Sequence, residues 1–169
     1  SGAGDDVILG GSGSDPIVAG GGDDIVLGDN GKLTYTDGKL TLIETTDPAT
    51  GAAETINGGD GNDLVFGGTG ADGMTGGSGQ NILVGDQGAI SFAINGDRIQ
   101  ITTTFNTLGA DDVINSGAGD DVILGGFGAD SINGGGGNDD ILGDNGQLSY
   151  TGGVLGLIST ADPVTGGAD

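Results

Sequence analysis

Short apolar runs return along the chain every nine residues. Each run follows glycines and an aspartate, as in "SGAGDDVIL" at residues 1–9, which recurs at residues 116–124. The copies begin at residues 1, 10 and 19, at 58, 67 and 76, and at 116, 125 and 134. Position eight of every copy is apolar, from Ile8 to Ile141. The pattern predicts strands of about three residues whose central side chain faces inward.

A second pattern follows each group of three copies. After the tetrads "GDNG", "GDQG" and "GDNG", which begin at residues 28, 85 and 143, apolar and polar residues alternate around a turn dipeptide. These dipeptides are Asp37-Gly38, Asn95-Gly96 and Gly152-Gly153. Period-two alternation on both sides of such a dipeptide predicts a β-hairpin. No stretch has a 3.6-residue apolar period, so we expect no long helix.

Nonapeptides and hairpins together repeat with a period of 57 or 58 residues. The blocks are 1–57, 58–115 and 116–169, each with three nonapeptides and a hairpin insert. They predict an all-β fold, one continuous solenoid segment over residues 1–169. Asp169 aligns with Glu54 and Asp112, so the third block stops three residues short of a full repeat. We therefore expect a segment of a longer repetitive protein.

The composition narrows the classes of function. The chain has 42 Gly, no Cys or His, and 25 acidic residues against three basic ones, a net charge of -22. Such values are typical of a disordered linker, but the strict spacing of apolar residues favours a folded chain. The charge disfavours nucleic acid and anionic membranes as partners. Without His or Cys, zinc and copper lack their favoured ligands. A folded chain with this charge needs a cation to neutralise it.

The nonapeptide itself indicates which cation. Glycines at positions one, two and four permit a tight turn, and position six adds a carboxylate. Strands stacked turn upon turn lie about 5 Å apart, so their carboxylates would repel one another. Calcium suits a flexible cage of six to eight oxygens better than magnesium does. The candidate ligands at position six are Asp6, Asp15, Asp24, Glu54, Asp63, Asp72, Asn81, Asp112, Asp121, Asp130 and Asp139.

The copies "GGDGNDLVF", "GGTGADGMT" and "GGGGNDDIL" resemble the nonapeptide of the RTX (repeats-in-toxin) family, GGxGxDxUx with U apolar. Nine copies in frame make the resemblance specific. It implies a parallel β-roll with two nonapeptides per turn, and calcium between one loop and the loop 18 residues later. Each ion would take both position-six side chains, carbonyls from positions two and four of the first loop, and carbonyls from positions one and three of the second.

Carried onto this chain, the resemblance implies five ligand pairs: Asp6–Asp24, Asp63–Asn81, Asp121–Asp139, Glu54–Asp72 and Asp112–Asp130. The implied carbonyl ligands are Gly2, Gly4, Ala19, Gly21, Gly59, Gly61, Gly76, Ser78, Gly117, Gly119, Gly134 and Gly136. Asp15 and Asp72 face the tetrads, where Asp29, Asp86 and Asp144 are candidates for the missing acid. Asn81 offers a neutral oxygen, so the Asp63–Asn81 site is expected to be the weaker one.

Some aspartates fall outside the position-six spacing. These are Asp5, Asp23, Asp120 and Asp140. We interpret them as solvated turn residues that cap their own backbone.

The residues on either side of position eight predict an apolar surface. They are apolar in first and third copies, as in Val7, Leu9, Leu64 and Phe66, and mostly polar in middle and partial copies. One sheet of the roll would thus be apolar on both faces and would need a cover. The hairpins are the preferred cover, with Leu33, Tyr35, Leu40 and Leu42 expected on one face. Another copy of the chain is the alternative.

Together these features favour a non-enzymatic calcium-binding structural segment of a secreted or cell-surface protein. An adhesin stalk, a surface layer or an extracellular fibre would fit, with self-association or packing against further copies of the repeat. The alternative is a calcium-dependent secretion or folding module of an RTX toxin or enzyme, exported by type I secretion. Carbohydrate or ice binding would need outward rows of Thr, and residues 102–104 are the one run of Thr. We expect no membrane insertion.

Overall fold

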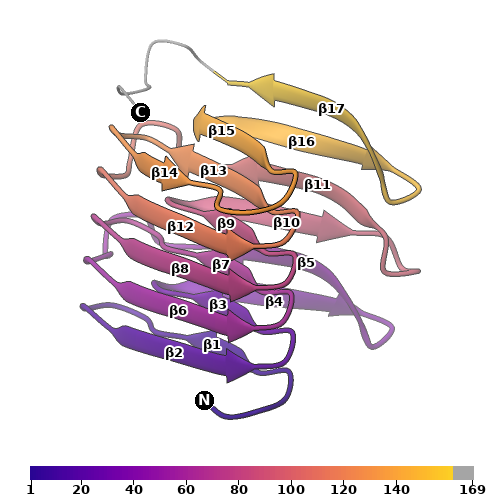
Figure 1. Cartoon of the computed structure of the whole chain (residues 1–169), viewed down its shortest axis with the longest axis horizontal. Coiled ribbons are helices and arrows are strands. Elements are labelled where there is room, and N and C mark those ends of the chain that lie inside the picture. Colours follow the sequence, from indigo (N-terminus) through magenta and orange to yellow (C-terminus); the bar gives the residue numbers. More distant parts are fainter. Residues whose placement is uncertain (162–169) are drawn as a thin grey trace.

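The computed structural model describes residues 1–161, which form three layers of β-sheet (Figure 1). Two layers are the walls of a roll, and the third is built from the hairpins. The described residues contain no helix, as the sequence predicted. Accordingly, none of them forms a helix long and apolar enough to span a membrane. The end of the third block, residues 162–169, lies outside the described part, together with most of its Pro-bearing loop.

The roll has two parallel sheets. The outer roll sheet contains β2 (Pro16–Gly21), β6 (Thr55–Asp60), β8 (Gly73–Ser78), β12 (Val113–Ala118) and β14 (Ser131–Asn133). The inner roll sheet contains β1 (Val7–Leu9), β3 (Ile25–Leu27), β7 (Leu64–Phe66), β9 (Ile82–Val84), β13 (Val122–Gly126) and β15 (Asp140–Asp144). First and third copies thus supply one sheet and middle and partial copies the other. The predicted parallel β-roll with two nonapeptides per turn is confirmed.

Position eight fills the space between the two roll sheets. The register stacks equivalent residues, for example Ile8 on Val26 and Val26 on Val65. The buried residues there are Ile17, Ala19, Val26, Ile56, Val65, Met74, Leu83, Ile114 and Ile123. Strands of the inner roll sheet are mostly three residues long, as predicted. Most strands of the outer roll sheet reach six residues because they continue into the glycines of the next copy.

The inserts form the third layer, the hairpin sheet. Its strands are β4 (Gly31–Thr36), β5 (Lys39–Thr45), β10 (Gly88–Phe92), β11 (Arg98–Thr103), β16 (Gly146–Thr151) and β17 (Val154–Thr160), all antiparallel. The Asp37-Gly38 turn has two positive φ angles, 50° and 74°, as a two-residue hairpin turn requires. Gly152-Gly153 does the same, whereas the Asn95-Gly96 turn is a longer loop between Phe92 and Arg98.

Neighbouring hairpins pair with one another, so the hairpin sheet is continuous. Strand β5 pairs with β10, and β11 pairs with β16. At both junctions a threonine hydroxyl accepts a backbone N–H from the next hairpin: Thr45 from Gly88 at 2.9 Å, and Thr103 from Gly146 at 3.0 Å. The blocks are therefore joined twice, through the roll and through the hairpins.

The hairpin sheet covers the apolar face of the inner roll sheet, which confirms the predicted intrachain cover. Phe66 is fully buried between the two layers. Its neighbours from the roll are Leu27, Ile82, Val84, Val122, Leu124 and Leu142, and those from the hairpins include Ile43, Ile90, Ile101 and Leu148. Each buried side chain of this size contributes about 1.5–3 kcal/mol to folding. The two apolar surfaces stabilise each other.

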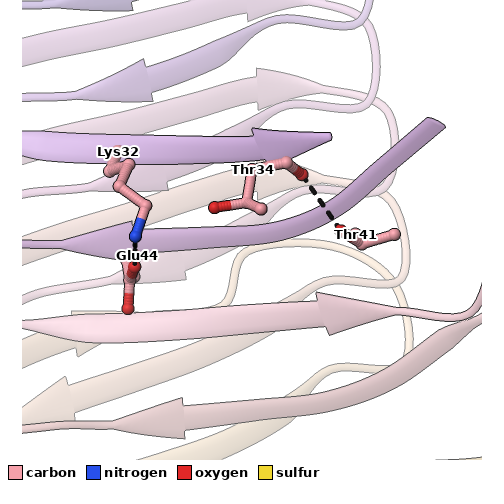
Figure 2. A network of polar contacts seen from close by, with 4 residues as sticks. All are labelled: Lys32, Thr34, Thr41 and Glu44. Carbon is pink, nitrogen blue, oxygen red and sulfur yellow. Dashed lines mark hydrogen bonds and ion pairs between the residues drawn. The ribbon is translucent and has the colours of Figure 1, made fainter. Parts of the chain in front are cut away.

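Two details of the first hairpin differ from the prediction. A bulge between Thr34 and Tyr35 shifts the register, so Tyr35 is 56% exposed while Leu33 and Leu40 pack on the core. Ile43 takes the buried place that was expected for Leu42, which lies opposite Thr34 in the register. The outward face is polar: Lys32 donates to Glu44 at 2.7 Å, and the Thr41 hydroxyl donates to the Thr34 carbonyl at 3.1 Å (Figure 2).

Candidate metal-binding edges of the roll

The position-six residues form two columns, one along each edge of the roll. In the first edge column, each backbone N–H donates to the side chain of the residue in the next coil. The bonds run from Asp6 to Asp24 (2.7 Å), to Asp63 (2.9 Å), to Asn81 (3.0 Å), to Asp121 (2.7 Å) and to Asp139 (3.0 Å). The second edge column continues likewise from Glu54 to Asp72 (2.8 Å), to Asp112 (2.8 Å) and to Asp130 (2.9 Å). Asp15 precedes β2 at the start of this column.

The columns pass through the inserts without interruption. All five predicted pairs are neighbours, but so are Asp24 and Asp63, Asp72 and Asp112, and Asn81 and Asp121, which lie 39 or 40 residues apart. The sequence analysis missed these three pairs because it counted only spacings of 18. The hairpins leave the roll at these points, and the next coil takes the same place as after a plain 18-residue turn.

One oxygen of most carboxylates in the columns has no partner. Among the described residues, Oδ2 of Asp24, Asp63, Asp72, Asp112 and Asp121 is buried without a hydrogen bond, as are both carboxylate oxygens of Glu54. A buried charge without a partner is costly. The unpartnered oxygens therefore indicate that something outside the protein chain binds there.

The chain itself offers no cation to these oxygens. Its three basic residues, Lys32, Lys39 and Arg98, all lie in the hairpin sheet. Within the described part of the chain, the one ion pair joins Lys32 to Glu44 on the outward face of that sheet. Neutralisation of the edge columns must therefore come from a bound ion or from protons.

Carboxylate and carbonyl oxygens converge at the position-one glycines. A Cβ added to Gly67 would overlap both the Gly85 carbonyl oxygen and Oδ2 of Asp72, and one added to Gly125 would overlap the Gly143 carbonyl and Asp130. Only hydrogen fits beside these oxygens, so glycine is required. The result is an oxygen-lined space between coils, and hard cations such as calcium prefer oxygen ligands.

The predicted carbonyl ligands face the junctions between coils 18 residues apart. The carbonyls at positions two and four point toward the following coil, against glycines of that coil; they belong to Gly2, Gly4, Gly59, Gly61, Gly117 and Gly119. The carbonyls at position three accept N–H groups of the preceding coil; they belong to Gly21, Ser78 and Gly136. At position one, Gly134 accepts the Ser116 hydroxyl, Gly76 faces Gly58, and Ala19 is buried.

The tetrad aspartates lie beside the second edge column. Asp29 accepts the N–H of Thr69 at 2.6 Å, and Asp86 accepts those of Ala110 and Phe127, so both hold the chain as it re-enters the roll. Asp29 interacts electrostatically with Asp15, and Asp86 with Asp130. Asp144 lies in β15 and has one buried unpartnered oxygen. All three add negative charge to the edges where the sequence analysis placed them.

Burial and like-charge repulsion raise the pKa values of the second edge. Burial is the largest cause at each group, followed by neighbouring carboxylates or opposed by backbone hydrogen bonds. The pKa of Glu54 rises to about 9, that of Asp72 to about 7, that of Asp86 to about 8 and that of Asp112 to about 9. Burial also raises the pKa values of Asp29 and Asp63. At neutral pH, these groups hold protons unless a cation replaces them.

The interpretation of the aspartates outside position six was wrong. Asp5, Asp23 and Asp120 do not cap their own backbone; each accepts an N–H from the next coil, those of Asp23 (2.9 Å), Asn62 (2.8 Å) and Asn138 (2.8 Å). They form an outer column at position five, exposed to solvent. Asp140 lies in strand β15 opposite Val122, not in a turn. Stacking at a fixed spacing gives position five the same partner geometry as position six.

These observations agree with a site made of two side chains and several carbonyls. Within residues 1–161, no three acidic side chains gather into a carboxylate cluster that could hold a metal by itself. Buried unpartnered oxygens and converging carbonyls are instead shared between adjacent coils. Asp24, Asp63, Asp121 and their neighbouring carbonyls fit a calcium ion, which would neutralise the paired carboxylates.

Comparison with known families agrees with this geometry. The RTX calcium-binding nonapeptide repeat matches the chain four times, over residues 1–32, 49–89, 104–132 and 117–147, together more than half of it. The chain therefore belongs to the RTX calcium-binding nonapeptide repeat family. The repeats of this family bind calcium, which confirms the predicted ion. No curated protein and no solved structure matched the chain.

Proposed function

We propose that this chain is a non-enzymatic structural segment of a secreted or cell-surface protein, folded and stiffened by calcium at the edges of its roll. One observation carries the proposal: two columns of buried carboxylates run through the stack with unpartnered oxygens and no cation from the chain. Ions along both edges would tie every coil to the next. An adhesin stalk, surface layer or fibre needs such a stiff, extended element.

The same uncompensated charge supports a second role, a secretion or folding module of an RTX toxin or enzyme. A chain with 25 acidic and three basic residues repels itself when compact. It would stay unfolded where calcium is scarce and fold where calcium is abundant. Both roles share calcium-dependent folding, and they differ in the load that the folded segment bears.

Two measurements test the proposal. Far-UV circular dichroism should show a disordered chain in EGTA and a β-rich one at 1–10 mM calcium, since weak extracellular sites have Kd values of about 10⁻⁴–10⁻³ M. Magnesium at the same concentration is the control and should act weakly. Single-molecule stretching between the two ends should then give a higher unfolding force in calcium than in EGTA. A chain that is equally β-rich and equally strong in EGTA would overturn the proposal.

A further inference from the structure

Asn81 is the one neutral residue in the first edge column. It is 1% exposed. Like the aspartates, it accepts the N–H of the preceding residue of the column, Asp63, through Oδ1 at 3.0 Å. Its Nδ2 donates to the Ser116 carbonyl at 3.3 Å and approaches the Gly79 carbonyl at 3.4 Å. Both functional atoms of the Asn81 side chain are thus used.

The hydrogen-bond network fixes the orientation of this amide. If the oxygen and nitrogen were exchanged, Nδ2 would face the Asp63 N–H, and Oδ1 would face the carbonyls of Ser116 and Gly79. Donor would then meet donor and acceptor would meet acceptor. The NH₂ group therefore points into the junction between the coil of Asn81 and the coil of Asp121.

Asp63 shows what usually occupies this place. Beside Gly58, Oδ2 of Asp63 faces the Gly76 carbonyl of the next coil, and this Oδ2 is buried without a partner. Beside Gly76, the equivalent pair is Nδ2 of Asn81 and the Ser116 carbonyl. Two oxygens that need a cation between them are replaced by a donor and an acceptor.

We propose that Asn81 replaces one calcium ion of the ladder with a hydrogen bond. The inference rests on the proposed calcium-dependent fold. The Gly79 and Ser116 carbonyls occupy positions four and one of their loops, which the family resemblance assigns to the ion. The affected junction is the one between Asn81 and Asp121, across the second insert, and not the Asp63–Asn81 junction that the sequence indicated. This joint would form without calcium and connect two calcium-bound stretches of the first edge.

Counting bound ions tests the inference. Equilibrium dialysis at saturating calcium should find one more ion per chain in Asn81→Asp than in wild type, and one fewer in Asp63→Asn, which creates a second amide joint. Both changes are isosteric. Asn62→Asp is the matched control: it adds the same charge next door, in the exposed outer column, and should leave the count unchanged.

A second readout does not depend on absolute stoichiometry. The slope of log folding equilibrium constant against log calcium concentration equals the ions taken up on folding. It should increase by about one in Asn81→Asp and decrease by about one in Asp63→Asn. If Asn81→Asp matches wild type in both count and slope, the inference is overturned, while calcium-induced folding of wild type would still support the proposed function. If wild type itself fails to fold with calcium, the proposed function fails first.

Discussion

Asp24 and Asp63 lie 39 residues apart in the sequence, yet the backbone N–H of Asp24 donates a 2.9 Å hydrogen bond to Oδ1 of Asp63. The whole first hairpin lies between them. The bond has the same direction and nearly the same length as those between residues 18 apart, such as Asp63 and Asn81. The edge column is thus a property of the stack and not of the local sequence, and variants in the column should act on neighbouring coils.

Asp121→Ala should weaken calcium binding much more than Asp120→Ala. Asp121 accepts the buried N–H of Asn81 at 2.7 Å and carries an unpartnered oxygen, whereas Asp120 is exposed. Loss of a buried charged acceptor costs about 1–3 kcal/mol before any lost ligand is counted, so the calcium midpoint of folding should rise at least about tenfold. Asp120→Ala should shift it less than about threefold. Equal shifts in calcium titrations followed by circular dichroism would show that bulk charge alone matters.

Gly67→Ala should disrupt the second edge. An added Cβ would overlap the Gly85 carbonyl and Oδ2 of Asp72, the two oxygens that face the proposed ion. Such overpacking costs about 1–3 kcal/mol, and it also closes the oxygen-lined space. Gly73→Ala is the control, because a Cβ there would meet only the Glu54 carbonyl at 3.9 Å. Calorimetry at saturating calcium should show a lower Tm for Gly67→Ala alone; an unchanged Tm and calcium midpoint would contradict the assignment.

Calcium binding should release protons at neutral pH. Without calcium, the folded state keeps protons on Glu54, Asp72, Asp86 and Asp112 up to pKa values of about 7 to 9, while the unfolded chain loses them near pH 4. The folded state then binds more protons, so its calcium-free stability falls as pH rises from about 4 to 9. Calcium should reverse this by displacing the protons.

A calcium titration in weakly buffered solution, started at pH 7, measures this release directly. The pH should fall as calcium is added. Glu54→Gln carries no titratable proton at that position, and it should release fewer protons per chain. A solution whose pH stays constant while the chain folds would rule out protonated edges in the calcium-free state.

Phe66→Asp should destabilise the calcium-bound monomer. Phe66 is fully buried between the inner roll sheet and the hairpin sheet, and truncation of such a residue alone costs about 3–5 kcal/mol. Val18→Asp is the control, since Val18 is 59% exposed on the outer roll sheet. Thermal unfolding with sedimentation analysis should show a much lower Tm for Phe66→Asp and little change for Val18→Asp. If Phe66→Asp changed only the oligomeric state, the hairpin sheet would not be the cover.

The sequence predicted the features that depend on a regular spacing. Nine-residue periodicity with apolar position eight indicated both sheets of the roll, and alternation around Asp37-Gly38 indicated a hairpin. The bulge at Tyr35 was not predictable, because a local change of register leaves no mark on the apolar pattern. The pairing of Ile43 with Ile90 was also missed. It follows from how successive hairpins lie over the roll, which is a tertiary property.

The candidate site was predictable in part for the same reason. Position six named Asp24, Asp63 and Asp121, and the structure places them in one column. Which junction Asn81 affects depends on the direction of its NH₂ group, and side-chain direction is set by the neighbouring coil. The outer column at Asp23 and Asn62 was misinterpreted because single aspartates in glycine-rich loops usually form local turns.

The continuous hairpin sheet restricts how this chain can change in length. Each of the three described hairpins adds two strands to its sheet, and each group of nonapeptides adds two strands to the inner roll sheet. Neighbouring strands lie about 4.8 Å apart in both, so the two stacks advance by the same distance. Loss or gain of one coil would put them out of step by a strand and expose apolar residues beyond that point. The molecule can therefore grow or shrink only in whole blocks of about 10 Å.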